Sequence, residues 1–341
     1  MRCDRWCRWI IVILIGVFVG VLPAVAQDDD VDIISPVDKC INLGNMLEAP
    51  REGDWGLTVE DAYLTVIADA GFDTVRIPIR WSAHAGDSAP YMIDAEFMAR
   101  VTHVVDTALD AGLQVIVNIH HYEEMMTDPD AEFERYLGLW EQIATTFMDY
   151  PDTLMFELLN EPNNKLNAVI WNDFYPDAIE VIREMNPTRQ IIVGGDEWNN
   201  ASALARLILP EDRENLIATF HFYDPFEFTH QGAEWAIDIG SNEWLGTEFG
   251  MDADFVLVNS VFDDVLDWQN ANQIPVLLGE FGAYSKADMA SRLLYTETVR
   301  QAAVSRGFGW CYWEFAAGFG IYNPNTERFN ELYLALIPDD E

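Results

Sequence analysis

Lysine is the scarcest charged residue of this 341-residue chain, which contains only Lys39, Lys165 and Lys286. Lysine and arginine together number 19, against 58 aspartates and glutamates, and the formal net charge at pH 7 is −39. Such a surface repels nucleic acids and anionic membranes, so the composition argues against both as partners. A neutral or cationic substrate fits it better, although a solvated acidic shell that keeps the protein soluble accounts for most of the charge.

Cysteine is almost as scarce, with four residues in the chain. Cys3 and Cys7 fall within the first 26 residues, whereas Cys40 and Cys311 lie in apolar runs near the two ends of the remaining sequence. If these runs are the first and last strands of a closed barrel they are neighbours, and a disulfide is conceivable in an oxidising compartment. Neighbouring strands seldom provide the required geometry, so we expect two buried free thiols.

The amino-terminal apolar run, Ile10 to Leu22, is too short for a comfortable transmembrane helix. It follows arginines at positions 2, 5 and 8 and precedes Ala24-Val25-Ala26, a small-x-small cleavage pattern. We therefore interpret residues 1–26 as a secretory signal peptide, with an uncleaved anchor as the alternative, and expect a secreted protein. Its removal takes away three arginines and one aspartate and changes the net charge from −39 to −41.

Residues 27–341 contain no linker, low-complexity run or repeat, which argues for one domain. Eight strand-like runs alternate with helix-like runs, and their Leu, Ile and Val content is typical of strands buried on both faces. We predict a single (β/α)8 barrel whose active site lies at the carboxyl-terminal ends of the strands. The predicted strands are Cys40–Asn45, Thr74–Pro78, Gln114–His120, the run that starts at Thr153, Ile191–Gly194, Leu216–His221, the run that starts at Ile274, and Gly309–Glu314.

Helices are predicted between these strands from amphipathic runs and their end signals. The pattern Thr58-x-x-Asp61 predicts a capped helix that runs to Ala70. The other predicted helices are Asp94–Ala111, Glu134–Tyr150, Trp171–Met185, a short one after Asn200, one ending near Asn272, Asp288–Arg306 and Asn330–Leu336. A long aromatic insertion, from Phe222 to about Ala253, separates the sixth strand from its helix.

Two glutamates stand where apolar strands end. Pro162 stops the fourth strand and leaves Glu161 at its carboxyl-terminal tip, and Gly279 and Gly282 break the seventh strand around Glu280. In a parallel barrel both would lie at one rim, and paired carboxylates there suggest cleavage of a glycosidic bond. The alternative is that each glutamate merely caps its strand or the following helix.

Further polar and aromatic residues fall at the ends of strands and would converge on the same rim. A charged Arg76 between Val75 and Ile77 is costly to bury unless it meets a carboxylate; the alternative is an arginine that orders a loop. His120 and His121 would point to opposite faces if the strand continues through them. The residues at or near the rim are Arg76, His120, Glu161, His221, Glu280 and Trp313.

With these residues in place, the sequence resembles glycoside hydrolase family 5, the retaining β-glycanases, over nearly the whole of residues 27–341. The resemblance is strongest to thermophilic bacterial endoglucanases of that family that also act on mannan. It rests on the ordered motifs Val75-Arg76-Ile-Pro78, Asn118-Ile-His120-His121-Tyr122, Leu-Asn160-Glu161-Pro162, His221-Phe222-Tyr223, Gly279-Glu280-Phe281-Gly282 and Trp310-Cys-Tyr-Trp313-Glu314.

The resemblance implies a role for each of these residues. Glu161 would be the general acid and base and Glu280 the nucleophile, with Arg76 and Tyr223 keeping Glu280 ionised and aimed. The negative charge of Glu280 would raise the pKa of Glu161. Asn160, His120 and His221 would line the subsite next to the cleaved bond, and Trp313 would form its floor. Weaker candidates for sugar contacts on rim loops are Asn45, Glu48, His121, Trp198 and Trp235.

The substrate implied is a β-linked polysaccharide or oligosaccharide. The enzyme would cleave internal bonds of β-glucan, with mannan as a second substrate, and would act as a monomer without cofactor or metal. A β-mannanase as the main activity is the first alternative. A metal-dependent barrel hydrolase with His120, His121, His221 and the glutamates as ligands is a second, disfavoured because Arg76 would repel a cation. A non-catalytic carbohydrate-binding barrel would have lost one of the carboxylates.

Overall fold

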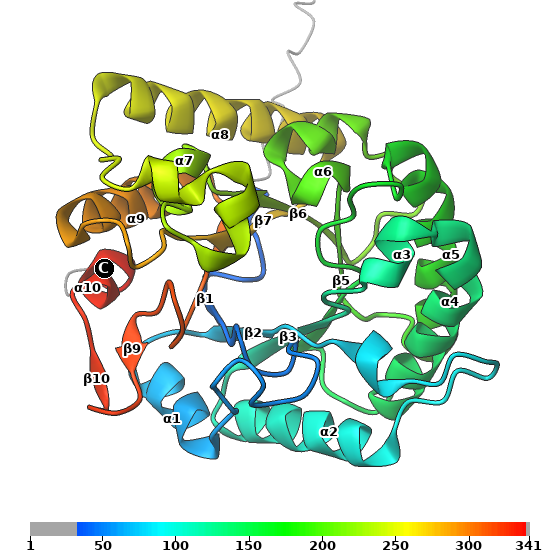
Figure 1. Cartoon of the computed structure of the whole chain (residues 1–341). Helices are drawn as coiled ribbons and strands as arrows, with labels where there is room; N and C mark the ends of the chain where they lie inside the picture. The colour runs from blue at the N-terminus through cyan, green and yellow to red at the C-terminus, as the bar shows by residue number, and fades with distance from the viewer. Residues whose placement is uncertain (1–32, 339–341) are drawn as a thin grey trace, which may run out of the picture. The chain divides into compact units, whose positions relative to one another are not determined.

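Eight parallel strands form a closed barrel in the computed structural model, which describes residues 33–338 (Figure 1). The strands follow one another around the ring in sequence order, and β8 pairs with β1 to close it. The predicted (β/α)8 fold is therefore confirmed. The strands are β1 Lys39–Asn42, β2 Thr74–Ile77, β3 Gln114–Asn118, β4 Leu154–Glu157, β5 Ile191–Gly194, β6 Leu216–Phe222, β7 Val276–Phe281 and β8 Gly309–Tyr312.

Helices surround the barrel and bury their apolar faces against the outer side of the strands (Figure 1). They are α1 Asp61–Asp69, α2 Ala95–Asp110, α3 Glu123–Thr127, α4 Pro129–Thr146, α5 Ala168–Met185, α6 Asp196–Asn199, α7 Phe226–Thr229, α8 Asp252–Asn272, α9 Met289–Val304 and α10 Leu332–Leu336. Short 3-10 turns are η1 Trp81–His84, η2 Ala201–Arg206, η3 Glu234–Ile239 and η4 Ser241–Trp244. The short helix predicted after Asn200 is the 3-10 turn η2.

The predicted cap of the first helix is wrong. Glu60, not Thr58, is the residue before α1, and no side chain caps the helix. The Thr58 hydroxyl instead donates to the Glu60 carboxylate, 3.0 Å away. The preference of threonine for bonding locally thus closes a turn before the helix begins. By contrast, the Asp94 side chain accepts from the amides of Glu96 and Phe97 and caps α2, where the pattern predicted the helix start.

Two layers of side chains fill the barrel interior, because alternate residues of each strand point inward. The layer nearer the amino-terminal ends is apolar and contains Val37, Cys40, Ile116, Met155, Ile192, Ile217, Leu277 and Cys311. Two residues further along the strands the inward positions become polar or lack a side chain: Asn42, Arg76, Asn118, Glu157, Gly194, Thr219 and Gly279. The fold therefore builds a polar floor directly beneath the rim.

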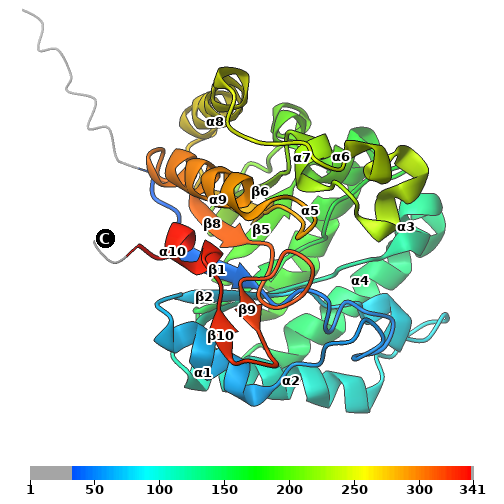
Figure 2. The same cartoon turned by 60° about the vertical axis from the view of Figure 1, so that its left-hand side comes forward.

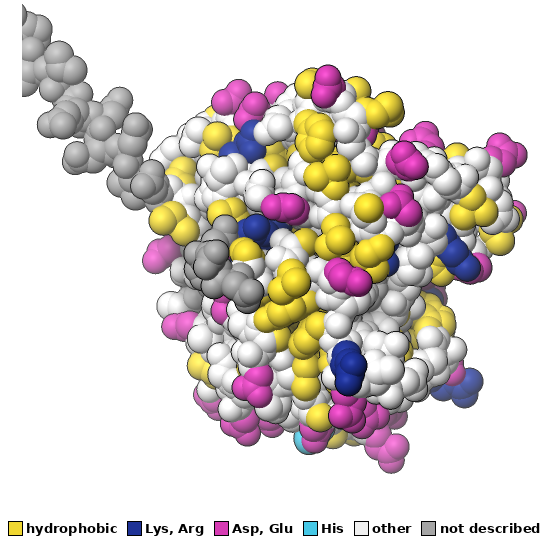
Figure 3. Space-filling view, turned by 90° about the vertical axis from the view of Figure 1, so that its left-hand side faces the viewer, with side chains coloured by type: hydrophobic (Ala, Val, Ile, Leu, Met, Phe, Trp, Pro, Cys, Tyr) yellow, Lys and Arg dark blue, Asp and Glu magenta, His cyan; other side chains and the backbone are white. Residues whose placement is uncertain are grey.

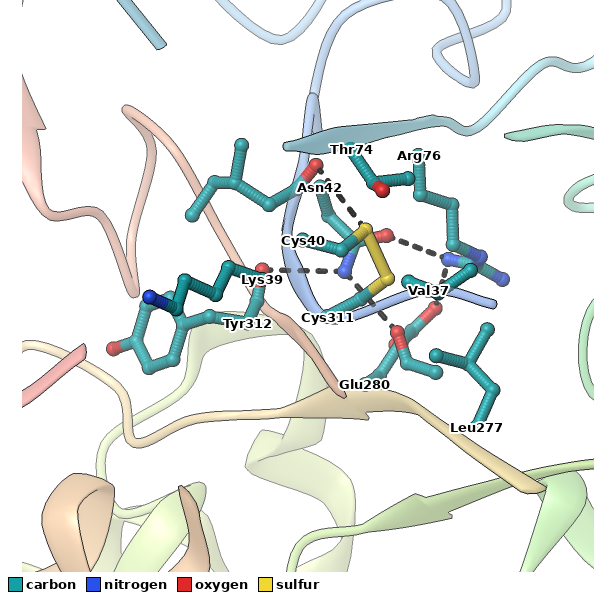
Figure 4. Close-up of a disulfide and its surroundings, with 12 residues drawn as sticks. Val37, Lys39, Cys40, Asn42, Thr74, Arg76, Leu277, Glu280, Cys311 and Tyr312 are labelled. Carbon is teal, nitrogen blue, oxygen red and sulfur yellow. Dashed lines mark hydrogen bonds and ion pairs between the residues drawn. A yellow bond between two sulfur atoms is a disulfide. The ribbon is translucent and has the colours of Figure 1, made fainter. Parts of the chain in front are cut away.

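Cys40 and Cys311 form a disulfide, which overturns the expectation of two free thiols. They are register partners on β1 and β8, and both belong to the apolar interior layer. Because both side chains point into the barrel at the same level, the sulfurs meet 2.12 Å apart. Figure 4 shows the bond beside the polar floor, near Asn42 and Arg76.

The insertion after β6 contains α7, η3 and η4 and lies over one side of the rim, as Figures 1 and 2 both show. A small antiparallel pair, β9 Tyr322–Asn323 with β10 Arg328–Phe329, follows β8 and lies near α1, where Tyr322 and Tyr63 make an edge-on ring contact (Figure 2). Acidic side chains are spread over the face drawn in Figure 3, and basic ones are few.

The predicted signal peptide, residues 1–26, and the boundary near Gln27 lie outside the described residues. Within residues 33–338, no helix combines the length and the apolar character that crossing a membrane requires.

Candidate active site

Arg76 is the centre of the polar floor, and all of its side-chain hydrogen-bond donors are used. Its Nε and Nη2 atoms donate to the two oxygens of Glu157, at 2.6 and 2.8 Å. Nη1 donates to Asn42 and to Glu280, and Nη2 also donates to Asn160, each at 2.8 Å. The predicted need for a carboxylate partner is met twice, and the fork with Glu157 fixes the guanidinium plane that orients Glu280 and Asn160.

Glu280, at the end of β7, accepts hydrogen bonds from two side chains that stabilise its ionised form. Its Oε1 accepts from Arg76 and its Oε2 accepts from the hydroxyl of Tyr223, 2.9 Å away. The pKa of Glu280 is raised on balance because burial, with a contribution from Glu161, outweighs the opposing effects of His221, Arg76 and the Tyr223 hydroxyl. The structure therefore places Arg76 and Tyr223 where the resemblance implied them.

Glu161 lies just beyond β4, with a left-handed backbone at φ 51° and a side chain 24% exposed. His221 is its hydrogen-bonding partner, with Nδ1 2.8 Å from Oε1. The pKa of Glu161 is raised to about 8, as expected, but the main cause is burial, and Glu157 is the carboxylate that adds to it. The expected cause, the negative charge of Glu280, is therefore not the one found. Arg76 is bonded to Glu280 and partly neutralises its charge.

The two candidate catalytic carboxyls lie close together. One oxygen of Glu161, one of Glu280 and one ring nitrogen of His221 are all within 4.8 Å of one another. Such a triad offers enough ligand atoms to bind a cation, but the Arg76 guanidinium already occupies Glu280 and opposes a second positive charge. A pair of carboxyls about 5 Å apart is the separation at which one can attack a sugar carbon while the other protonates the leaving oxygen.

His120 and His121 follow β3, which ends at Asn118, so the alternation of a strand no longer separates their rings. The rings touch edge to face with centroids 4.6 Å apart. Asn118 accepts from the Ile79 amide through its oxygen and so offers its NH2 to His120 Nδ1, at 3.1 Å. Burial lowers the pKa of His120 well below its usual value, so the neutral ring carries its hydrogen on Nε2.

Trp313 follows β8, and its ring lies parallel to that of His120, with centroids 5.8 Å apart. Asn45, on the loop after β1, is partly exposed and has a left-handed backbone. Glu48 differs from the expectation of a sugar contact, because it is fully buried and its two carboxylate oxygens accept the backbone amides of Asn45 and Met46. As it lies, Glu48 shapes the loop that presents Asn45.

Trp198 and Trp235 are 57% and 62% exposed and lie on different loops. Trp198 sits in a run of three left-handed residues, 197–199, and Arg206 holds the start of that run through Asp196 and Glu197. Trp235, in the insertion, packs edge-on against Tyr284 with ring centroids 4.9 Å apart. Both rings therefore combine exposure with a supported backbone, which suits a sugar platform.

Sequence reasoning missed several residues of the site. Glu157 is a charged residue within an apolar strand, as Arg76 is. Two opposite charges in buried strands could have predicted that the two side chains pair. Asn42 and Asn118 occupy inward positions that only the register reveals. Glu314 is buried beneath Trp313, where burial raises its pKa to about 8 and its Oε1 accepts the Phe319 amide.

Comparison with known proteins gives consistent matches over the barrel. The model of the family described as cellulase (glycosyl hydrolase family 5) matches residues 40–318. Endoglucanase H of Acetivibrio thermocellus is 37% identical over 309 residues, which cover 89% of this chain and 33% of that protein. This chain thus spans about a third of the length of that relative.

Solved structures match almost end to end. Thermotoga maritima Cel5A in complex with cellobiose is 46% identical with a TM-score of 0.87, covering 88% of this chain and 97% of that one. The same protein in complex with mannotriose is 46% identical with a TM-score of 0.86 and the same coverage.

Proposed function

This chain belongs to the cellulase family, glycosyl hydrolase family 5, and from that premise we propose that it is a retaining endo-β-1,4-glycanase acting on β-glucan, with mannan as a second substrate. The observation that carries the mechanism is the short separation of the two carboxyls: one oxygen of Glu161 lies within 4.8 Å of one oxygen of Glu280. Inverting glycosidases hold their carboxyls further apart to leave room for a water, so this separation favours retention.

In the first step, Glu280 attacks the anomeric carbon and Glu161 protonates the departing oxygen. Arg76 and Tyr223 donate to Glu280 and stabilise its ionised form, whereas burial raises the pKa of Glu161 to about 8 and so keeps its proton in place. Asn160, held by Arg76, is placed to bond the sugar hydroxyl beside the cleaved bond. The two glutamates thus divide the roles because their neighbours differ.

In the second step, Glu161 acts as the base that activates water against the glycosyl-enzyme. Glu161 gave its proton to the departing oxygen in the first step, so it is now a carboxylate that can accept a proton from the attacking water. His221 then stabilises the carboxylate form of Glu161 by donating from Nδ1.

Trp313 and the rim aromatics support a polymeric substrate. Trp313 offers a flat surface to the sugar at the cleaved bond, and Trp198 and Trp235 lie on separate loops that flank further sugar positions. Thermotoga maritima Cel5A, 46% identical, has been solved with cellobiose and with mannotriose, which supports both substrate classes here. We propose in addition that the enzyme is exported by residues 1–26 and works as a monomer.

Azide rescue of alanine variants distinguishes the acid/base role of Glu161 from the nucleophile role of Glu280. In Glu161→Ala, an aryl glycoside with an acidic phenol should still form the intermediate, and azide, which needs no base, should restore turnover and give the β-glycosyl azide. Glu280→Ala should lose retaining hydrolysis of every substrate and give only the α azide. General acid help is worth roughly 10²–10⁴-fold, so poor leaving groups should suffer most in Glu161→Ala.

The matched control is Glu141→Ala, which removes an exposed glutamate of α4 far from the rim and should leave all rates unchanged. The same azide anomer from both variants, or an equal loss for all leaving groups in Glu161→Ala, would contradict the assignment. Viscosity loss of a mixed β-glucan ahead of reducing-sugar release tests the endo mode; release of single sugars without viscosity loss would exclude it.

A further inference from the structure

Asn42, the last residue of β1, binds three other strands of the barrel through its side-chain amide. The amide is buried in the polar floor. Its Oδ1 accepts from Nη1 of Arg76 at 2.8 Å, and its Nδ2 donates to the backbone carbonyls of Gly279 and Tyr312, each at 3.2 Å. Figure 4 shows Asn42 beside the disulfide, between Arg76 and Tyr312. One side chain thus ties β1 to β2, β7 and β8.

The orientation of this amide follows from the chemistry of its partners. A guanidinium only donates hydrogen bonds and a backbone carbonyl only accepts them, so the oxygen of Asn42 must face Arg76 and the NH2 must face the two carbonyls. The opposite orientation would place N–H groups against the guanidinium and an oxygen against two oxygens. Both hydrogens of the NH2 are therefore used, one for each carbonyl, and the plane of the amide is fixed.

The oxygen of Asn42 helps to aim Glu280 through Arg76. Nη1 of Arg76 carries two hydrogens, and it donates to Oδ1 of Asn42 and to Oε1 of Glu280, at 2.8 Å in each case. Because Asn42 holds one of these hydrogens, the other is directed at the carboxylate. The bonds to Glu157 fix Nε and Nη2 of the guanidinium, and Asn42 fixes the nitrogen that faces Glu280.

The strand β7 departs from regular alternation at the point that the NH2 group binds. Leu277 points into the barrel and Leu278 points outward into the surrounding core, so strict alternation would turn Gly279 inward and Glu280 outward. Glu280 nevertheless faces the barrel interior, where it meets the guanidinium, and Phe281 packs outward. Two consecutive residues of β7 therefore lie on its inner side.

A bulge at Gly279 explains this arrangement. Against β6, Gly279 is an extra residue between Leu278 and Glu280, which are both paired, and the pairing of β7 with β8 shifts over the same stretch. A Cβ at Gly279 would stand 2.6 Å from the Thr219 hydroxyl, so the bulged position requires a glycine. Bulges re-aim the side chains beside them. Asn42 donates to the carbonyl of the bulged residue itself.

We propose that Asn42 is a positioning residue for the nucleophile: its NH2 holds the bulge that turns Glu280 inward, and its oxygen holds the guanidinium that aims the carboxylate. The bond to Tyr312 fixes the plane in which both contacts are made. Asn42 thus acts through Gly279 and Arg76. The inference rests on the proposed role of Glu280 as the nucleophile.

The first test measures nucleophilic attack by itself. Its probe is a dinitrophenyl β-cellobioside that carries fluorine in place of the hydroxyl beside the anomeric carbon, which makes the glycosyl-enzyme long-lived. A carboxylate oxygen of Glu280 bonds to the anomeric carbon, and dinitrophenolate departs with the electron pair and needs no general acid. Asn42→Ala should form this intermediate about 10²-fold more slowly than the wild type, the effect of a displacement of about 1 Å at a reacting group.

The second readout is the dependence of hydrolysis on the leaving group. Asn42→Ala leaves the acid Glu161 unchanged, so kcat/KM should fall by the same factor for good and poor aryl leaving groups. Glu161→Ala, by contrast, should suffer most with poor ones. A general distortion of the site would disturb both glutamates, so a uniform loss identifies an effect on the nucleophile.

Asn186 provides the matched control. It is also buried, its Oδ1 accepts from Arg189 at 3.2 Å, and its Nδ2 donates to the carbonyl of Ala144 at 2.9 Å. Asn186 follows α5 and precedes β5, so it lies at the end of the barrel opposite the rim. Asn186→Ala should lose stability in urea denaturation as Asn42→Ala does, but should form the glycosyl-enzyme at the wild-type rate.

A second pair of variants serves if Asn42→Ala does not fold. Asn42→Asp keeps the shape of the side chain and the acceptor for Arg76 but lacks the NH2 group. It should form the glycosyl-enzyme at least about tenfold more slowly, the equivalent of one lost hydrogen bond. Asn186→Asp, its control, should keep the wild-type rate.

A wild-type rate of intermediate formation in Asn42→Ala or Asn42→Asp would overturn the proposal. An equal loss in the Asn186 variants, or a loss that grows as the leaving group becomes poorer, would overturn it as well. If instead Glu280 were not the nucleophile, the wild-type protein would not acquire the glycosyl label on Glu280, which mass spectrometry of its peptides would show. The two failures are therefore distinguishable.

Discussion

Replacement of Arg76 by lysine separates what its charge does from what its shape does. Arg76→Lys keeps the positive charge beside Glu280 and Glu157 but replaces a rigid fork of five N–H groups with one ammonium. The fork now serves Glu157, Glu280, Asn42 and Asn160 at the same time. An ammonium has three donors, and its single nitrogen cannot reach four side chains on separate strands.

The expected cost follows from the partners left behind. At least two buried oxygens lose a charge-assisted hydrogen bond worth about 1.5–3 kcal/mol each, so the free energy of unfolding should fall by about 3–6 kcal/mol. Glu280 and Asn160 would also lose their alignment. A displacement of about 1 Å at a reacting group costs on the order of 10²-fold, so kcat/KM should fall by at least that factor.

Arg189→Lys is the matched control. Arg189 is equally buried at the amino-terminal side of β5, where it donates to four backbone carbonyls and to the side chain of Asn186. In urea denaturation, its free energy of unfolding should fall by a similar amount. At urea concentrations below the unfolding transition, its kcat/KM should equal that of the wild type. The reasoning fails if Arg76→Lys retains wild-type kcat/KM, or if Arg189→Lys loses as much activity as Arg76→Lys.

Three further predictions concern stability. Replacing Cys40 and Cys311 together by serine opens a cross-link between residues 271 positions apart and should cost about 2–5 kcal/mol in denaturant unfolding; an unchanged midpoint would argue that the bond does not form in solution. The pKa of Glu161 is about 8 in the folded protein against an ordinary 4.5, so the native state holds a proton that the unfolded chain releases, and stability should fall as pH rises from about 4.5 to about 8. Glu161→Gln cannot ionise and should therefore be more stable than the wild type by a few kcal/mol at pH 9 and equal to it at pH 4, whereas parallel pH profiles would refute the shift. With a net charge of −39, Tm should rise between dilute buffer and moderate sodium chloride because salt screens self-repulsion over a Debye length of ~10 Å at 0.1 M; a flat curve would mean that the carboxylates are already neutralised locally.

The tertiary structure decided which inward side chains meet. Cys40 and Cys311 form a disulfide because the register across the β1–β8 junction places them opposite each other, and no local pattern encodes that register. Glu157 became the main partner of Arg76 for the same reason: both occupy the second inward layer of neighbouring parts of the ring. The cause of the raised pKa of Glu161 also depends on depth and on three-dimensional neighbours, which residue spacing does not contain.

The sequence by itself determined the eight-fold alternation of strand and helix and the position of Glu161 and Glu280 at strand ends. Those features are local, since they follow from apolar runs, from proline and glycine at their ends, and from helical periodicity. The resemblance of the sequence to glycoside hydrolase family 5 also predicted that Arg76 and Tyr223 lie near Glu280. Only the closed barrel decided the disulfide and the Glu157–Arg76 pair, because each depends on which residues of distant strands share a level of the ring.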